Sequence, residues 1–131
     1  MKSMFDYTII ADFISPSLKD RVIYELATPK KRTKAWERFS HNIDSVINLD
    51  YIYFKGNSIS NVIKTEIKNS TKNECLVLSF EYQEGKTMSI DKAFDYLFDE
   101  VSAVLIFNGN WLVIKSEYEG GEGSFYVLKK N

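Results

Sequence analysis

Apolar residues recur at steps of three and four along much of the chain, the spacing of a helix that buries one face. Helix start signals precede three of these stretches, at Ser15-Pro16-Ser17, Thr28-Pro29 and Ser89. The pattern predicts helices over residues 18–26, 29–47, 59–67 and 90–101. In the third of these, the Ile and Val residues would also suit a strand.

Runs of β-branched and aromatic residues between turn signals predict strands. They cover residues 5–14, 51–54, 76–82, 104–107, 111–118 and 125–128. Asn108-Gly109-Asn110 is a strong hairpin signal, and residues 120–123 make a second, Gly-rich turn. We therefore expect an α+β fold with a helix-rich first half and an antiparallel sheet that ends in a C-terminal three-stranded meander. No Ser/Gly/Pro-rich linker divides residues 1–131, which predicts a single domain.

Composition is typical of a folded domain. Hydrophobic residues make up 44% and charged residues 27% of the 131, which excludes a disordered chain. The longest strongly apolar run, residues 103–107, is far shorter than the roughly 20 residues of a membrane helix, so we expect no membrane association. Asp6 and Asp12 interrupt anything like a signal-peptide core, and the single Cys75 excludes an internal disulfide. Both observations favour the cytoplasm.

The sequence offers little catalytic chemistry. Gly85-Lys86-Thr87 lies where a phosphate-binding loop would lie, but that loop needs a Gly at the position of Phe80. His41 is the only histidine, so a His-based metal site cannot form, and Cys75 in an apolar strand favours a structural role. We expect no catalytic residue, no metal and no cofactor, and hence a protein that is not an enzyme.

Charge is distributed unevenly although its formal sum is only −1. Residues 1–72 carry a formal +4 and residues 73–131 a formal −5. In the acidic half, three aspartates repeat every four residues on one helical face: Asp91, Asp95 and Asp99. Three glutamates surround the last turn: Glu117, Glu119 and Glu122. Such charge polarity steers association, although a solvated face remains the alternative for each cluster.

The basic half contains a cluster at the start of the predicted 29–47 helix, made of Lys30, Lys31, Arg32, Lys34 and Arg38. Cations at a helix N-terminus oppose the helix dipole. A solvated face and contact with phosphate are the two interpretations of this cluster. Aromatic residues that would stack on bases are missing from it, so we expect a protein partner rather than nucleic acid.

Aromatic residues make up 15% of the chain and either fill the core or anchor an interface. Four lie on apolar helical faces and are predicted to be internal: Trp36, Phe39, Phe94 and Phe98. Four others are candidates for contact with a partner: Tyr53, Tyr96, Trp111 and Tyr118.

The closing segment, from Ser102 to Leu128, resembles the tail of small bacterial immunity proteins in its hairpin pattern, acidic turn and chain size. These proteins neutralise polymorphic or contact-dependent growth-inhibition toxins. The resemblance covers roughly a quarter of the chain and implies a cytosolic non-enzyme that binds one toxin domain tightly, often a basic nuclease. The cluster from Lys30 to Lys34 departs from a simple acidic mimic of nucleic acid.

The sequence thus leads to a first hypothesis of a partner-binding protein, an immunity protein that contacts its toxin through the acidic half. The predicted contact residues are Asp91, Asp95, Asp99, Trp111, Glu117, Tyr118, Glu119 and Glu122. The alternative is a nucleic-acid-associated or regulatory module that uses Lys30, Lys31, Arg32, Lys34 and Arg38. A third possibility is a small enzyme without a recognisable motif, whose pocket would contain His41 and carboxylates.

Overall fold

A six-stranded antiparallel sheet forms the centre of the computed structural model, which describes residues 6–70, 73–116 and 124–130. The strands lie in the order β1-β6-β5-β4-β2-β3, and all neighbours pair antiparallel. Their bounds are β1 Ile52–Gly56, β2 Glu74–Ser79, β3 Lys86–Ser89, β4 Val104–Asn108, β5 Trp111–Lys115 and β6 Phe125–Lys129.

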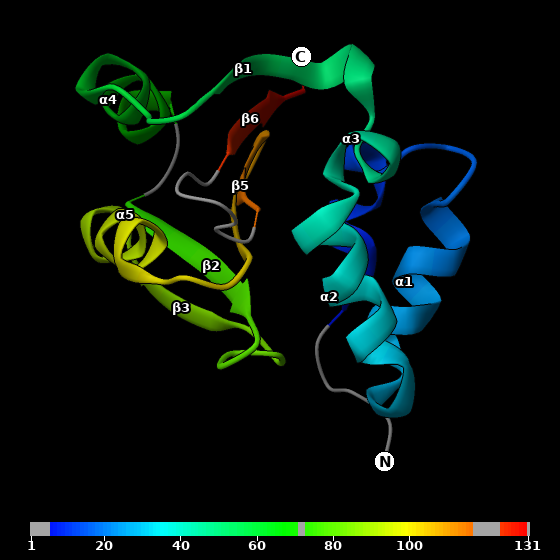
Figure 1. Ribbon diagram of the computed structural model, residues 1–131. Helices are drawn as coiled ribbons and strands as arrows, with labels where there is room; N and C mark the ends of the chain where they lie inside the picture. Colours follow the sequence, from blue (N-terminus) through cyan, green and yellow to red (C-terminus); the bar gives the residue numbers. More distant parts are fainter. Residues whose placement is uncertain (1–5, 71–72, 117–123, 131) are drawn as a thin grey trace.

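Helices cover both faces of this sheet (Figure 1). One face carries the 3₁₀ helix η1 (Tyr7–Phe13), α1 (Lys19–Ala27), α2 (Arg32–His41) and α3 (Ile43–Val46). The opposite face carries α4 (Asn61–Ser70) and α5 (Ile90–Asp99). Two further 3₁₀ turns, η2 (Pro29–Lys31) and η3 (Leu49–Tyr51), precede α2 and β1.

The sheet separates two hydrophobic cores because successive side chains of a strand point to opposite faces. In β5, Leu112 and Ile114 pack into the core beneath α1 and α2. Trp111 and Val113 pack into the core beneath α4 and α5, which includes Phe94. Burial on both faces explains why β4 and β5 are apolar at almost every position.

The predicted α+β class is confirmed, as is the C-terminal meander of β4, β5 and β6. The β4–β5 hairpin closes at the pair Asn108 and Trp111, and Gly109 takes a positive φ of 60° in its turn. The helices predicted over residues 18–26, 59–67 and 90–101 correspond to α1, α4 and α5.

The strand predicted over residues 5–14 is wrong. The Asp6 side chain accepts a hydrogen bond from the Thr8 backbone N–H at 3.0 Å and begins η1 instead. Among residues 6–14, only Ile14 pairs as a strand residue, in an isolated bridge to Ile47. The single helix predicted over residues 29–47 is also wrong, since the backbone leaves helical geometry at Asn42 (φ −132°, ψ 36°) and separates α2 from α3.

The strand predicted over residues 76–82 ends early, and the short strand β3 was not predicted. The Ser79 hydroxyl accepts a hydrogen bond from the Tyr82 backbone N–H at 3.0 Å, which turns the chain after β2. Gly85 then takes a positive φ of 86° and leads into β3. Gly85-Lys86-Thr87 is therefore a hairpin turn and the start of a strand rather than a phosphate-binding loop.

Candidate interaction surfaces

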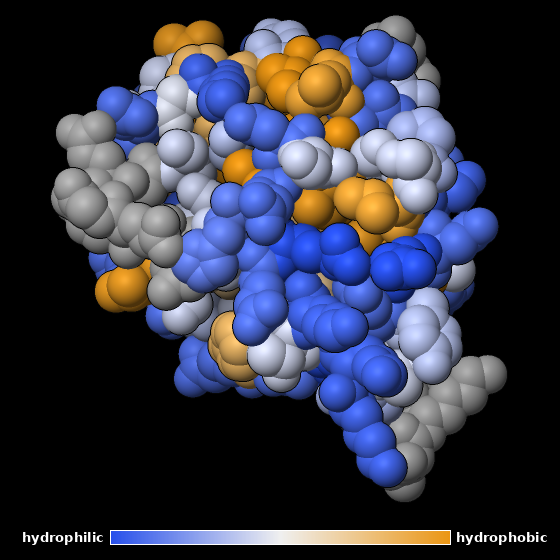
Figure 2. Space-filling model, turned by 45° about the vertical axis from the view of Figure 1, so that its right-hand side comes forward, coloured by the Kyte–Doolittle hydropathy of each residue, from blue (hydrophilic) through white to orange (hydrophobic). Residues whose placement is uncertain are grey.

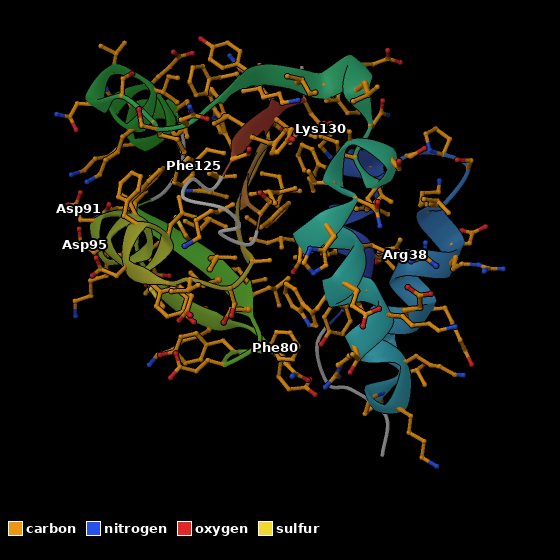
Figure 3. All side chains as sticks on the ribbon, in the orientation of Figure 1. Arg38, Phe80, Asp91, Asp95, Phe125 and Lys130 are labelled. Atoms are coloured by element: carbon orange, nitrogen blue, oxygen red, sulfur yellow. The ribbon has the colours of Figure 1, made fainter. Side chains whose placement is uncertain are left out.

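Helix α5 presents the aspartate row to solvent. The Ser89 hydroxyl caps its first turn by accepting from the Lys92 N–H, as the sequence predicted. The apolar face is fully buried and comprises Ile90, Ala93, Phe94 and Leu97. Asp91, Asp95 and Asp99 are therefore left on the outer side of the helix, where all three are exposed. Figure 3 labels Asp91 and Asp95 on this side.

The three aspartates differ in what they can offer a partner. Asp91 forms ion pairs with Lys64 and Lys68 of α4, each at 3.1 Å, and hydrogen bonds from these lysines lower its pKa. Asp95 and Asp99 form no ion pair with any other residue in the described part of the chain. The charge available on this face is therefore concentrated toward the C-terminal end of α5.

Phe98 is exposed, and its prediction as a core residue is wrong. Its side chain is 46% exposed, and Val101 just after the helix is 61% exposed. The inner side of the Phe98 ring packs against Phe94 and against Phe125 of β6, with centroid distances of 6.0 and 5.6 Å. Phe98 lies one position beyond Leu97, at the margin of the buried face, and the outer side of its ring faces solvent. We call Asp95, Phe98, Asp99 and Val101 the α5 patch.

Lys115 at the end of β5 lies close to the α5 patch and was not singled out from the sequence. Lys115 is only 3% exposed, and its removal from water lowers the pKa of its ammonium group. The nearby carboxylates of Glu100 and Asp99 act in the opposite direction and favour the charged form. Asp99 thus stabilises a buried cation in addition to contributing charge to the surface.

Trp111 cannot contact a partner directly, which corrects its prediction as a surface anchor. It is 1% exposed, and its indole N–H donates to the Ser70 hydroxyl at 2.8 Å. Tyr53 packs edge-on against the Trp111 ring, is 46% exposed and donates its hydroxyl to Glu66. Half-buried Tyr96 bonds with the Ser79 hydroxyl at 2.8 Å, and burial raises its pKa to about 12. The other predicted contacts lie outside the described residues: Glu117, Tyr118, Glu119 and Glu122.

The predicted basic cluster does not form one continuous surface. Arg32 is buried and donates to the Leu26 carbonyl at 2.7 Å and to the Glu84 carboxylate at 2.8 Å. Arg38 donates twice to Glu25, at 3.0 and 3.1 Å, and these bonds raise the pKa of Arg38. Only three members of the cluster are exposed: Lys30, Lys31 and Lys34.

A groove of about 400 Å³ lies between α1 and α2. We call it the α1–α2 groove; its lining residues are Asp20, Arg21, Tyr24, Glu25, Lys31 and Lys34. Arg21 and Tyr24 come from α1 and were not predicted as site residues, because the charges of α1 are of both signs and form no basic cluster in the sequence. Their combination with Lys31 and Lys34 depends on the packing of α1 against α2.

The candidate catalytic groups are dispersed. His41 is exposed at the end of α2, whereas Cys75 is buried in β2. Desolvation raises the pKa of the Cys75 thiol to about 11, although a hydrogen bond from Asn108 opposes the shift. A larger groove of about 590 Å³ near Cys75 includes Glu74 but not His41. Within the described residues, no three His, Cys, Asp or Glu side chains gather in a way that could hold a metal ion.

Comparison with known proteins gives no relative for this chain: no family model, no curated protein and no solved structure matches it. In the described part of the chain, no helix combines the length and apolarity required to span a bilayer.

Proposed function

We propose that this chain is a protein-binding module, specifically an immunity protein that binds and neutralises a cognate bacterial toxin domain in the cytoplasm through the α5 patch. The observation that carries the proposal is the exposure of two large apolar side chains beside carboxylates, Phe98 in the last turn of α5 and Val101 just after it. Contiguous exposed apolar patches with a polar rim mark interaction sites, and the proposal is that Phe98 and Val101 form the apolar part of one.

The partner should present an apolar pocket with a basic rim. The Phe98 ring already packs against Phe94 and Phe125 on its inner side. Little side-chain conformational entropy is therefore lost when a partner buries the outer side of the ring. Rigid aromatic anchors of this kind carry much of the free energy of binding at interfaces. Asp95 and Asp99 would steer a basic surface toward the pocket and would chiefly increase the association rate.

The resemblance of residues 102–128 to immunity proteins supports a toxin domain as the partner. The strands in this segment, β4, β5 and β6, form the sheet centre against which Phe98 packs through Phe125. A basic nuclease domain would meet the acidic charge of the α5 patch. The dispersal of His41, Cys75 and the carboxylates supports binding rather than catalysis as the means of neutralisation.

The test is growth rescue by co-expression with the toxin domain encoded beside the gene for this chain. Rescue, together with a dissociation constant below about 1 μM by calorimetry, is the expected result. The proposal is overturned if no toxin gene adjoins this one, or if the encoded domain neither binds the chain nor has its toxicity relieved by it.

The site is tested with two single substitutions. Phe98→Ala should weaken binding roughly 30-fold, equivalent to about 2 kcal/mol, because it removes the anchor. Asp95→Lys should mainly slow association and reduce its dependence on salt. Asp99 is left in place because it also stabilises Lys115.

Matched controls carry the same chemical change away from the α5 patch. Leu49→Ala removes an apolar side chain that is 59% exposed, and Glu37→Lys reverses an exposed charge on α2. Both should bind like the unmodified chain. If toxin binding persists while Phe98→Ala and Asp95→Lys leave it unchanged, the immunity function stands and the α5 patch is not its site.

A further inference from the structure

Three exposed cations converge on the α1–α2 groove without a carboxylate partner among the described residues. They are Arg21, Lys31 and Lys34. Figure 2 shows the molecule with the α1 and α2 side brought forward, where hydrophilic side chains cover much of the face. Lys31 and Lys34 oppose the dipole of α2, which has no acidic residue in its first turn to offset them.

The carboxylates in the groove do not cancel this charge. Glu25 is only 4% exposed and already accepts two hydrogen bonds from Arg38, so its charge is compensated within the fold. Asp20 is the one remaining carboxylate of the lining. The groove therefore keeps a net positive charge, with Asp20 as one hydrogen-bond acceptor in its lining.

Tyr24 adds an aromatic surface to the same groove. Its side chain is 59% exposed, the largest exposure of an aromatic residue in the described chain. An exposed ring beside lysine and arginine is the combination that binds a base by stacking and its phosphate by charge. The volume, about 400 Å³, lies in the range of small-ligand sites.

We infer that the α1–α2 groove binds a nucleotide, with its phosphate between Arg21, Lys31 and Lys34 and its base on Tyr24. The carboxylates of an acidic peptide would pair with the cations but would leave the Tyr24 ring without a partner, and Asp20 would repel any carboxylate close to it. A nucleotide uses the ring, and Asp20 can accept a hydrogen bond from an exocyclic amino group of the base. The nucleotide can be free or can be part of a single strand, since both present the same groups.

The experiment is calorimetric titration of the full chain with AMP and with a short single-stranded oligodeoxynucleotide, at about 50 and about 200 mM salt. Binding of either probe that weakens as salt rises is expected. Binding of AMP assigns the site to free nucleotides, whereas binding of the oligonucleotide alone assigns it to a strand. Absence of binding by both probes overturns the inference.

Substitutions separate stacking from charge. Tyr24→Ala should weaken binding about tenfold, and Tyr24→Phe should retain it because the ring persists. Lys31→Ala with Lys34→Ala should weaken binding at least as much and should flatten the salt dependence. The matched control, Lys19→Ala with Lys92→Ala, removes two exposed charges outside the groove and should leave binding unchanged.

Inorganic phosphate and a glutamate-rich peptide serve as competing probes. Both should bind more weakly than the nucleotide and should not respond to Tyr24→Ala. The inference is overturned if phosphate or the peptide binds as tightly as the nucleotide probes. It is also overturned if the Lys19→Ala, Lys92→Ala control loses as much affinity as the Lys31→Ala, Lys34→Ala protein, which we call the groove variant. Either result would mean that the groove is only a basic surface. None of these measurements involves the α5 patch. They therefore test nucleotide binding whether or not the chain binds a toxin through that patch.

Discussion

Arg32 is a cation that the sequence places in a solvent-exposed run and that the structure places in the interior. Its guanidinium group joins three elements: it donates to the Leu26 carbonyl at the end of α1, pairs with Glu84 of the β2–β3 turn, and lies over the Tyr7 ring of η1 at 5.7 Å. Glu84 is 52 residues away in the sequence. Local sequence patterns could not reveal this pairing, because its partners meet only when both helical and sheet layers are formed.

Replacement of Arg32 should therefore be far more destabilising than replacement of its neighbour Lys30. Arg32→Ala leaves the Leu26 carbonyl without its side-chain donor and opens space beside Tyr7, and we expect a loss of about 2 kcal/mol in the free energy of unfolding. Lys30→Ala removes an exposed charge and should change it by less than about 0.5 kcal/mol. Urea unfolding of both variants measures the difference, and equal losses would contradict the structural role of Arg32.

Cys75 should make stability depend on pH on the alkaline side. Its thiol has a pKa of about 11 in the folded chain against an ordinary value of 9.0, so the unfolded thiol ionises first as pH rises. The unfolded state then binds fewer protons than the folded state, and stability falls between about pH 9 and 11. The stabilisation is complete below pH 9 and is lost as pH rises through the folded value.

The measurement is the urea midpoint of the unmodified chain and of Cys75→Ala at several values of pH. The substitution removes the titrating group, so its midpoint should fall less steeply with pH over this window. Tyr96 accounts for part of the slope that remains, because burial raises its pKa to about 12. Identical slopes in the two proteins would falsify the assignment to Cys75.

At the scale of elements, prediction succeeded where a long periodic pattern met a strong terminal signal. Helix α5 has both: a continuous apolar face and the Ser89 cap. The hairpin between β4 and β5 likewise follows from the Asn108-Gly109-Asn110 turn. These signals are local, so they do not depend on how the layers pack.

Prediction failed where a single side chain decides the backbone. Asp6 begins η1 in a segment whose apolar content suits a strand, and Ser79 turns the chain inside a predicted strand. Strand β3 has only four residues and no buried position, so it carries no alternation to detect. The α1–α2 groove could not be predicted either, since Tyr24 and Arg21 belong to a helix of mixed charge and meet Lys31 and Lys34 only through the packing of α1 against α2.

For the whole molecule, the opposite charges of the two halves of the chain are partly neutralised within the fold. Three ion pairs join a cation of residues 1–72 to a carboxylate of residues 73–131: Arg32 pairs with Glu84, and Lys64 and Lys68 pair with Asp91. The pairs of Lys129 with Glu66 and of Lys130 with Asp12 join the halves in the opposite sense, with the cation in the acidic half. Asp91 and Lys130 are labelled in Figure 3. The α1–α2 groove and the α5 patch lie on opposite sides of the sheet, as do the helices that carry them (Figure 1).

The two surfaces should act independently of each other. The packed sheet lies between them, and no described residue of the α1–α2 groove belongs to the α5 patch. Sites without shared residues or a common two-state element have little coupling free energy. We therefore expect saturation with AMP or the oligonucleotide to leave toxin affinity unchanged within about twofold.

Calorimetry of toxin binding with and without the nucleotide probe measures this coupling, and the reciprocal titration must give the same factor. The Lys31→Ala, Lys34→Ala variant should also bind toxin like the unmodified chain, while Phe98→Ala should keep its nucleotide affinity. A tenfold change in either cross-measurement would mean that the sheet transmits a rearrangement between its faces or that the toxin also contacts the groove. If the groove variant loses toxin affinity when no nucleotide is present, the toxin contacts the groove directly, because no nucleotide-induced rearrangement can then be the cause.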